Sequence, residues 1–221
     1  MKAKNFEYTI IKSKRKSLSI AVLPNMKVKV RAPLKATEKF IFEVIEEKTP
    51  WILKKLAFFE EFGIKKENNK ILFLGKNLQL IFQVSENKSV TIKEEEIIIL
   101  GKNPEKVFED WLKAKVNEVF SNYLEECYSI FSKYFNYKKP ILKIRKMKSR
   151  WGSLSSLGII TLNFHLIKTP PECLHYVIMH ELCHLKHQNH SCKFRELETF
   201  FVPNAKELNK KLKQFGAFLK Y

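Results

Sequence analysis

The segment His180-Glu181-Leu182-Cys183-His184-Leu185-Lys186-His187-Gln188-Asn189-His190 contains four of the six histidines of the chain. The other two, His165 and His175, lie shortly before it, and the first 164 residues contain none. Two histidines four residues apart, with a glutamate next to the first, form the H-E-x-x-H pattern of zinc hydrolases. Histidines concentrated in this way predict a metal site.

Helical spacing gives the pattern its chemistry. A step of four residues places His180 and His184 on one face of a helix, where both imidazoles can reach a single ion. Glu181 then lies close to the open position of the metal, where it can take a proton from a water molecule that the metal activates. We therefore expect Zn²⁺ on His180 and His184, with Glu181 as the catalytic general base.

A catalytic zinc also needs a third protein ligand and one open position. His190 is the first candidate, because a break in the helix at Gln188-Asn189 would let the chain turn back toward the ion. His187 lies one turn beyond His184, and we expect it to be an outer contact or exposed to solvent. The rival third ligands are Glu196, Glu198 and Cys192.

Composition limits the possible partners. The 221 residues carry a formal net charge of +18, but only five of the 41 basic residues are arginines. Arginine is the residue that recognises phosphate through paired hydrogen bonds, whereas dispersed lysines mainly increase solubility. Association with nucleic acid is therefore expected to be non-specific at most.

The same composition bears on location. No apolar run reaches the length of about 18 residues that a membrane helix needs, and the first residues do not resemble a secretory signal. The four cysteines form no C-x-x-C pair. We therefore expect a cytoplasmic protein with reduced thiols and no membrane association.

Hydrophobic periodicity suggests two regions. Residues 1–102 read as an antiparallel β-meander followed by helices and hairpins, and residues 103–221 as the catalytic domain. The expected elements include strands at 6–12, 17–23 and 27–31, helices at 38–48 and 51–62, a long helix from 104 to about 135, strands at 141–146 and 158–164, a helix at 172–187, and a C-terminal helix. No internal repeat is visible in the sequence.

Residues before the motif supply candidates for substrate binding. The run Lys143–Arg150 holds five basic residues in eight, and strand alternation would place Lys146, Lys148 and Arg150 on one side of the cleft. Arg150 can bind a substrate carboxylate or phosphate, or pair with a structural acid. Asn163 can hydrogen-bond the substrate or cap the end of its strand.

Three segments resemble the YgjP-like metal-dependent hydrolases, relatives of the WLM and SprT-like metallopeptidases. They are Arg150-Trp151-Gly152-Ser153-Leu154-Ser155, Ile160–Phe164 and His180–Phe194, and the stretch from Tyr8 to Pro33 is also similar to that family. The resemblance implies an α+β fold with a zincin-like catalytic domain, in which the H-E-x-x-H helix packs on a small, mostly antiparallel sheet behind an N-terminal β-rich and helical region. It also implies zinc held by His180, His184 and His190, with Glu181 as general base. By position, Ile159–Phe164 would be the edge strand along which an extended substrate pairs.

The leading functional hypothesis is a zinc metallopeptidase acting on peptides or proteins. One alternative on the same metal site, which the resemblance suggests, is a nucleoside-triphosphate pyrophosphohydrolase of the UTP type. The absence of an acidic cluster for magnesium argues against it. A second alternative is a DNA-associated protease that cleaves DNA-bound proteins. A non-enzymatic binding module with structural zinc is the third, although closed structural sites use four protein ligands.

Overall fold

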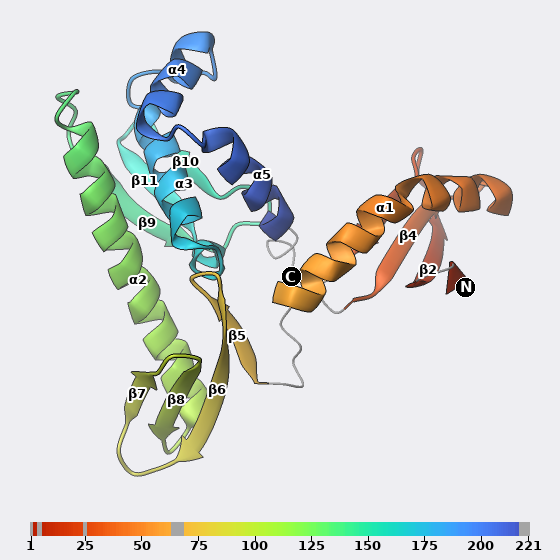
Figure 1. The fold of residues 1–221 in the computed structure, drawn as a ribbon, viewed down its shortest axis with the longest axis horizontal. Coiled ribbons are helices and arrows are strands. Elements are labelled where there is room, and N and C mark those ends of the chain that lie inside the picture. The colour runs from red at the N-terminus through yellow and green to blue at the C-terminus, as the bar shows by residue number, and fades with distance from the viewer. Residues whose placement is uncertain (1, 4–5, 24–25, 63–68, 217–221) are drawn as a thin grey trace. The chain divides into compact units, whose positions relative to one another are not determined.

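The computed structural model describes residues 2–3, 6–23, 26–62 and 69–216 (Figure 1). The chain divides into two compact units, Met1–Asn68 and Asn69–Tyr221. The boundary expected from the sequence, between residues 102 and 103, differs because the strands before it pair with one another and pack on the helix after it. None of the helices in the described ranges is long and apolar enough to cross a membrane.

The N-terminal unit is a four-stranded sheet followed by a helix. Its elements are β1 (Lys2–Ala3), β2 (Phe6–Ser13), β3 (Ser19–Val22), β4 (Val28–Pro33) and α1 (Glu38–Phe62). The strand order is β1-β2-β4-β3, with β2 parallel to β4 and β3 antiparallel to β4. The expected antiparallel meander was wrong, because β3 lies on the far side of β4 and does not pair with β2.

Helix α1 replaces the two helices that the sequence predicted. Pro50 lies inside it, although proline removes one backbone hydrogen bond and usually bends a helix. The Thr49 hydroxyl donates to the Ile45 carbonyl at 2.9 Å, a bond to the preceding turn that often accompanies a bend in a helix. The helix continues past Pro50, and Figure 1 shows it bending along its length.

The C-terminal unit begins with a second four-stranded sheet and a long helix. Their elements are β5 (Lys70–Phe73), β6 (Lys76–Val84), β7 (Ser89–Ile92), β8 (Glu96–Gly101) and α2 (Pro104–Phe131). The Asn103 side chain caps α2 by accepting from the Lys106 amide at 3.0 Å. The long helix predicted from the sequence is confirmed, and its apolar side chains Val116, Phe120 and Leu124 are buried in the core.

The remaining elements carry the histidine motif. They are β9 (Ile141–Arg145), β10 (Gly152–Leu154), β11 (Ile159–Asn163), a short 3₁₀ helix (Phe164–Lys168), α3 (Pro171–Cys183), α4 (Cys192–Phe201) and α5 (Ala205–Phe215). Strand order is β10-β11-β9, with one antiparallel and one parallel pair. Helix α3 contacts β10, α2, α4 and α5, so it runs through the core of this unit. The expected α+β class is confirmed. The sheet beside the motif was expected to be mostly antiparallel, and it has one antiparallel and one parallel strand pair.

One topology occurs three times along the chain. In β2-β3-β4, β6-β7-β8 and β9-β10-β11, the first strand is parallel to the third, and the second is antiparallel to the third at the sheet edge. A helix follows each third strand and contacts the edge strand of its own sheet, α1 on β3, α2 on β7 and α3 on β10. The sequence showed no repeat because the recurrence lies in strand pairing and not in residue identity.

Candidate metal centre and active-site pocket

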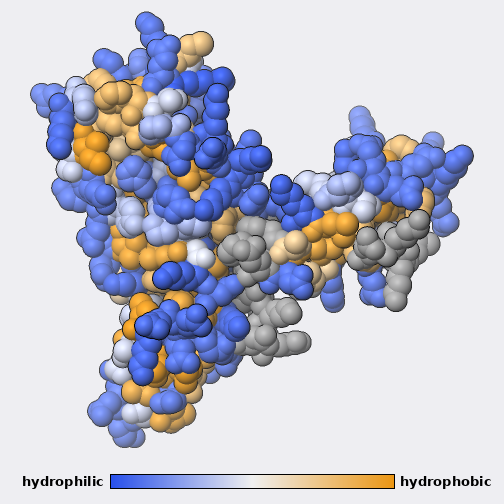
Figure 2. All heavy atoms as spheres, viewed as in Figure 1, coloured by the Kyte–Doolittle hydropathy of each residue, from blue (hydrophilic) through white to orange (hydrophobic). Residues whose placement is uncertain are grey.

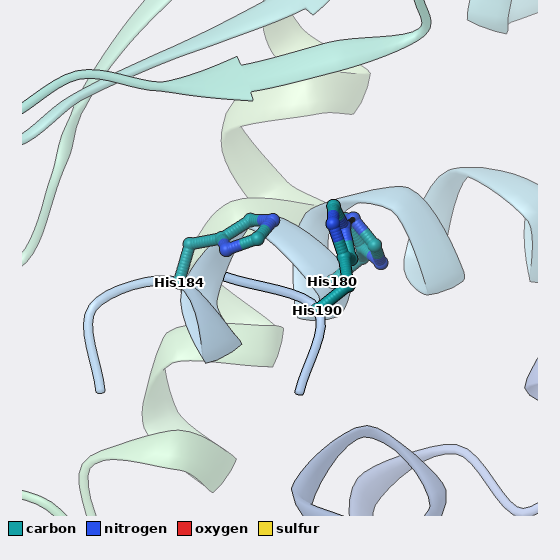
Figure 3. A group of neighbouring side chains, drawn as sticks. All are labelled: His180, His184 and His190. Atoms are coloured by element: carbon teal, nitrogen blue, oxygen red, sulfur yellow. Dashed lines mark hydrogen bonds between the residues drawn. The ribbon is translucent and has the colours of Figure 1, made fainter. Parts of the chain in front are cut away.

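Three imidazoles converge at the end of α3. One ring nitrogen from each of His180, His184 and His190 lies within 4.8 Å of the other two (Figure 3). The Nε2 atoms of His180 and His190 are 3.2 Å apart. Two nitrogens bound to one tetrahedral zinc, each at about 2.0–2.1 Å, would lie about 3.3 Å apart. The donor set and its spacing therefore fit a divalent ion such as zinc.

Hydrogen bonds orient two of these rings. His180 Nδ1 lies 2.6 Å from Glu198 Oε1, and His184 Nδ1 lies 3.0 Å from the His187 carbonyl. A carbonyl oxygen only accepts, and an ionised carboxylate does the same. Each Nδ1 therefore carries the proton, and each Nε2 presents its lone pair to the shared space, as a metal ligand requires.

The end of α3 explains how His190 reaches the other two. The helix was expected to continue to His187, but its last residue is Cys183 and His184 occupies the C-cap. The amides that follow bond to carbonyls three residues earlier instead of four. Leu185 donates to Leu182 at 2.9 Å and Lys186 to Cys183 at 3.1 Å, which tightens the last turn. The chain thus turns earlier than the predicted break and brings His190 back to the helix.

The buried Phe194 ring supports the whole group. Its centroid lies 5.1 Å from that of His180, 4.5 Å from His184 and 4.8 Å from His190. Phe194 is fully buried on α4, and the Ser191 hydroxyl caps the start of that helix by accepting the Phe194 amide. Sequence reasoning missed this residue, because an apolar side chain after the motif carries no sign of its role.

Glu181 is a buried carboxyl next to strand β10. Only 6% of the residue is exposed, and burial raises the pKa of its carboxyl to about 7, against the opposing effects of His180 and Arg150. The Leu154 amide donates a hydrogen bond to this carboxylate. The edge strand therefore fixes the position of Glu181 through its main chain.

Gly152 makes room for that carboxylate. A Cβ at Gly152 would lie 2.6 Å from Glu181 Oε1 and 2.9 Å from Val177 Cγ1. Both are shorter than real Cβ contacts, and Glu181 has little space to retreat because it is buried. The glycine of the Arg-Trp-Gly-Ser segment therefore has a steric role that the sequence did not reveal.

We expect Gly152→Ala to lower the hydrolytic rate without loss of the metal. The methyl group displaces Glu181, whereas all three imidazoles come from other elements. The rate and the bound metal, measured on the same preparation, test this expectation. Gly216→Ala is the matched control, because a Cβ there meets nothing within 4 Å. Loss of metal in Gly152→Ala would contradict the assigned cause.

Glu198 anchors His180 and does not join the three imidazoles. Burial alone would raise its pKa, but hydrogen bonds from His180 and from the Tyr176 hydroxyl outweigh burial and hold the pKa below its usual value. The rival ligands Glu196 and Cys192 are exposed and are not part of the group. The sequence marked Glu198 as a possible ligand, and the structure instead places it behind the His180 ring.

We expect Glu198→Gln to weaken metal affinity by about 10- to 100-fold, the usual cost of losing an outer carboxylate partner of a ligand histidine. The amide can accept from His180 but carries no charge to hold the proton on Nδ1. Competition with a chromogenic chelator measures the affinity. Glu196→Gln, an exposed change on the same helix, is the control and should bind metal like the wild type. Equal affinities for the two variants would contradict the anchoring role.

A pocket of about 520 Å³ opens over these groups. It is lined by Arg150, Gly152, Ser153, Leu154, Ser155, Ser156, His180, Glu181, His184, Gln188 and His190. Strand β10 forms one wall and lies at the sheet edge, whereas β11 lies between β10 and β9. The expectation that Ile159–Phe164 is an edge strand was therefore wrong, because β11 is the middle strand and β10 lies at the sheet edge.

Of the two residues expected to bind substrate, only Arg150 lines the pocket. Asn163 is fully buried, and its Nδ2 donates to the carbonyls of Met147 and Arg150 at 2.7 and 2.8 Å. Its side chain also caps the 3₁₀ helix by accepting from the His165 amide at 3.2 Å. Asn163 thus holds the loop that ends at Arg150, and its amide is not available to a substrate.

The basic run also folds differently from the expectation. Strand β9 ends at Arg145, and residues 146–150 form a loop, so no strand face presents Lys146 and Lys148 together with Arg150. Strand β9 lies at the opposite edge of the sheet from β10. Of the three basic residues expected beside the pocket, Arg150 is therefore the one that lines it.

A mixed α+β fold with three imidazoles and a buried glutamate at one pocket defines the class of metal-dependent hydrolases. The chain belongs to the YgjP-like family, whose metallopeptidase domain matches residues 16–215. That family implies a divalent metal. No curated protein matches the chain.

Two solved structures are similar over less than half of the chain. One is the metallopeptidase zymogen of Pyrococcus abyssi abylysin, 26% identical, covering 42% of this chain and 90% of that one, with a TM-score of 0.38. The other is the metallopeptidase zymogen of Methanocaldococcus jannaschii jannalysin, 25% identical, covering 45% and 94%, with a TM-score of 0.35.

Proposed function

We propose that this protein is a zinc metallopeptidase, with the metal on His180, His184 and His190 and Glu181 as the general base. The observation that supports the proposal is the convergence of three imidazole nitrogens in a pocket that Glu181 also lines. Three neutral imidazoles with one side left open are typical of catalytic zinc. Burial and the two neighbouring imidazoles lower the pKa of His184, which favours the neutral ring that binds metal.

Each residue of the chain has a distinct task in this proposal. A divalent ion in this position supplies Lewis acidity to a water molecule and to the scissile carbonyl. Glu181 takes the proton of the attacking water and passes it to the leaving amine. The Leu154 amide and the space left by Gly152 hold the carboxylate in place for both transfers.

Strand β10 offers a binding edge for an extended peptide. The Ser155 amide bonds to the Ile159 carbonyl at 3.0 Å, so the alternate residues, Gly152 and Leu154, point their main-chain groups away from β11. The Leu154 amide faces Glu181, which leaves the Gly152 amide and carbonyl and the Leu154 carbonyl for a peptide. A peptide strand that pairs with this edge gains main-chain hydrogen bonds without strong sequence preference. Such pairing brings a peptide bond to the rim of the metal group.

The pocket favours a peptide over a nucleoside triphosphate. Among the described residues that line it, Glu181 is the single carboxylate, whereas triphosphate chemistry generally uses magnesium held by acidic side chains. Arg150 alone supplies positive charge, and one guanidinium suits a peptide carboxylate as well as a phosphate.

The test measures hydrolysis by the zinc-loaded protein. The substrates are unstructured proteins, with and without duplex DNA, and nucleoside triphosphates. Glu181→Gln serves as the blank. Proteolysis that depends on Glu181 and not on DNA is the expected result. A strict DNA requirement would indicate a DNA-associated protease. Release of phosphate or pyrophosphate alone, dependent on Glu181, would make the peptidase proposal wrong.

A further inference from the structure

We propose that the N-terminal unit binds an extended peptide segment, with apolar and acidic side chains, in a groove between β3 and α1. The groove has a volume of about 430 Å³ and is lined by Leu18, Ser19, Ile20, Val44, Lys48 and Trp51. It lies wholly within the N-terminal unit and contains no part of the metal centre. Figure 2 shows hydrophobic atoms along α1 between hydrophilic ones, and Trp51 is 44% exposed there.

The edge of β3 has main-chain groups that can pair with a further strand. Among the described residues β3 lies at the sheet edge. The Leu23 amide donates to the Lys27 carbonyl at 2.9 Å, which places Leu23 in the register that faces β4. The alternate residues, Ile20 and Val22, therefore point their amides and carbonyls away from the sheet. An edge of this kind recruits a peptide strand.

This groove corresponds in topology to the active-site pocket. Each lies between the edge strand of a β-β-β-α repeat and the helix that follows, β3 with α1 and β10 with α3. In both edge strands, alternate residues direct their main-chain groups outward. The same architecture that presents β10 to a substrate therefore presents β3 to a second extended segment. This comparison rests on the proposed function, whereas the groove and the free edge of β3 do not.

Helix positions strengthen the correspondence. Val44 and Val177 each lie six residues after the first residue of their helix, Glu38 and Pro171. By the same count, Lys48 takes the place of Glu181, and Trp51 that of His184. Among the described residues that line the groove there is no histidine and no carboxylate. The groove therefore corresponds to the pocket by position in the topology, but its lining lacks the histidines and the glutamate, so a peptide held there would not be cleaved.

Charge and hydropathy define the occupant. The basic run Lys14-Arg15-Lys16 lies just before Leu18, the first residue of the groove, whereas Lys48 in the groove is already paired with Glu47 at 2.6 Å. The groove itself is lined mainly by apolar side chains, with Trp51 as a wide contact surface. A strand that alternates apolar and acidic residues would place apolar side chains toward α1 and keep carboxylates near the lysines.

Hydrogen exchange of the full-length Glu181→Gln protein tests this inference at the residues concerned. The probe is a short peptide of alternating valine and glutamate. We expect the amides of Ile20 and Val22 to exchange more slowly when the peptide is present, because they acquire hydrogen-bond partners. A peptide of the same sequence with N-methylated backbone amides should give no protection. No turnover is involved, so the result does not depend on the peptidase proposal.

Variants of α1 locate the binding to the groove. Trp51→Ala should weaken peptide binding by about tenfold or more, the usual result of truncating a tryptophan anchor. Phe40→Ala is the matched control, because Phe40 is 48% exposed on the same helix and does not line the groove. Both variants should keep the thermal midpoint of the parent protein, since both side chains are substantially exposed.

Several outcomes would overturn the inference. Protection confined to β10, or equal protection by the N-methylated peptide, would exclude pairing at β3. Equal binding by a peptide of alternating valine and lysine would exclude the acidic occupant. A dimer in sedimentation that dissociates in Trp51→Ala would show that a second copy of this chain fills the groove. Competition by an oligonucleotide that is insensitive to Trp51→Ala would show only non-specific charge binding.

Discussion

Glu181→Gln is expected to lower the hydrolytic rate by about 10²- to 10⁴-fold, the usual contribution of a general acid–base group. The amide cannot accept the proton of the attacking water, and no other carboxylate among the described lining residues can replace it. Bound zinc should stay at one ion per chain, because the three imidazoles are untouched. The rate and the metal content are measured on one preparation.

The structure also indicates that Glu181→Gln will fold normally. Glutamine has the shape of glutamate, and its carbonyl can accept the Leu154 amide in place of the carboxylate. It removes an ionisable group from a site where burial disfavours charge. The thermal midpoint should therefore be equal to or above that of the wild type. A variant that loses zinc along with activity would show that Glu181 has a structural role instead.

His190→Ala is expected to weaken zinc binding by more than the roughly 10- to 100-fold that loss of an outer partner costs. It removes one of three imidazole donors, and the Nε2 atom lost is the one 3.2 Å from His180. Because His190 is exposed in the loop before α4, folding should change little. Competition with a chelator gives the affinity, and activity should fall in parallel at limiting zinc.

His187→Ala is the control for this variant. His187 contributes its main-chain carbonyl to His184, and that contact does not require the side chain. Its affinity for zinc should therefore match the wild type. Equal losses in the two variants, or a loss in His187→Ala alone, would mean that the third donor has been assigned to the wrong histidine.

The sequence predicted the parts of the site that follow from local spacing. The step from His180 to His184 is a property of one helix, and the turn to His190 needs only a few residues. Even here the predicted end of α3 was too late in the sequence. The four-residue step from His180 to His184 is the same whether His184 lies inside the helix or at its C-cap. Local patterns thus identified the three imidazoles that the structure brings together.

Parts of the site that depend on strand pairing were not predictable. The order of strands in a sheet cannot be read from the sequence. Ile159–Phe164 was therefore predicted to be the edge strand, whereas the edge strand is β10. Asn163 was expected either to contact a substrate or to cap the end of its strand, and only its burial and its bonds to the neighbouring main chain decided for the second role. Gly152 and Phe194 act through neighbours that only tertiary structure supplies.

The repeated topology has the same explanation. Three sheets share one arrangement of parallel first and third strands, yet no repeated motif in the sequence marks it. Pairing of the first strand with the third skips the nearest neighbour in sequence, which is why the N-terminal strands were expected to form a plain meander. Only the third repeat carries histidines on its helix, and only there does the groove carry the metal chemistry.

Anomalous diffraction at the zinc absorption edge, from crystals of the zinc-loaded protein, tests the central claim most directly. We expect a single strong peak in contact with the Nε2 atoms of His180, His184 and His190, with Glu198 bonded to the far side of the His180 ring. A peak bound by Glu198 or Cys192, or one that leaves out His190, would contradict the proposed metal centre and the role given to Glu181 beside it.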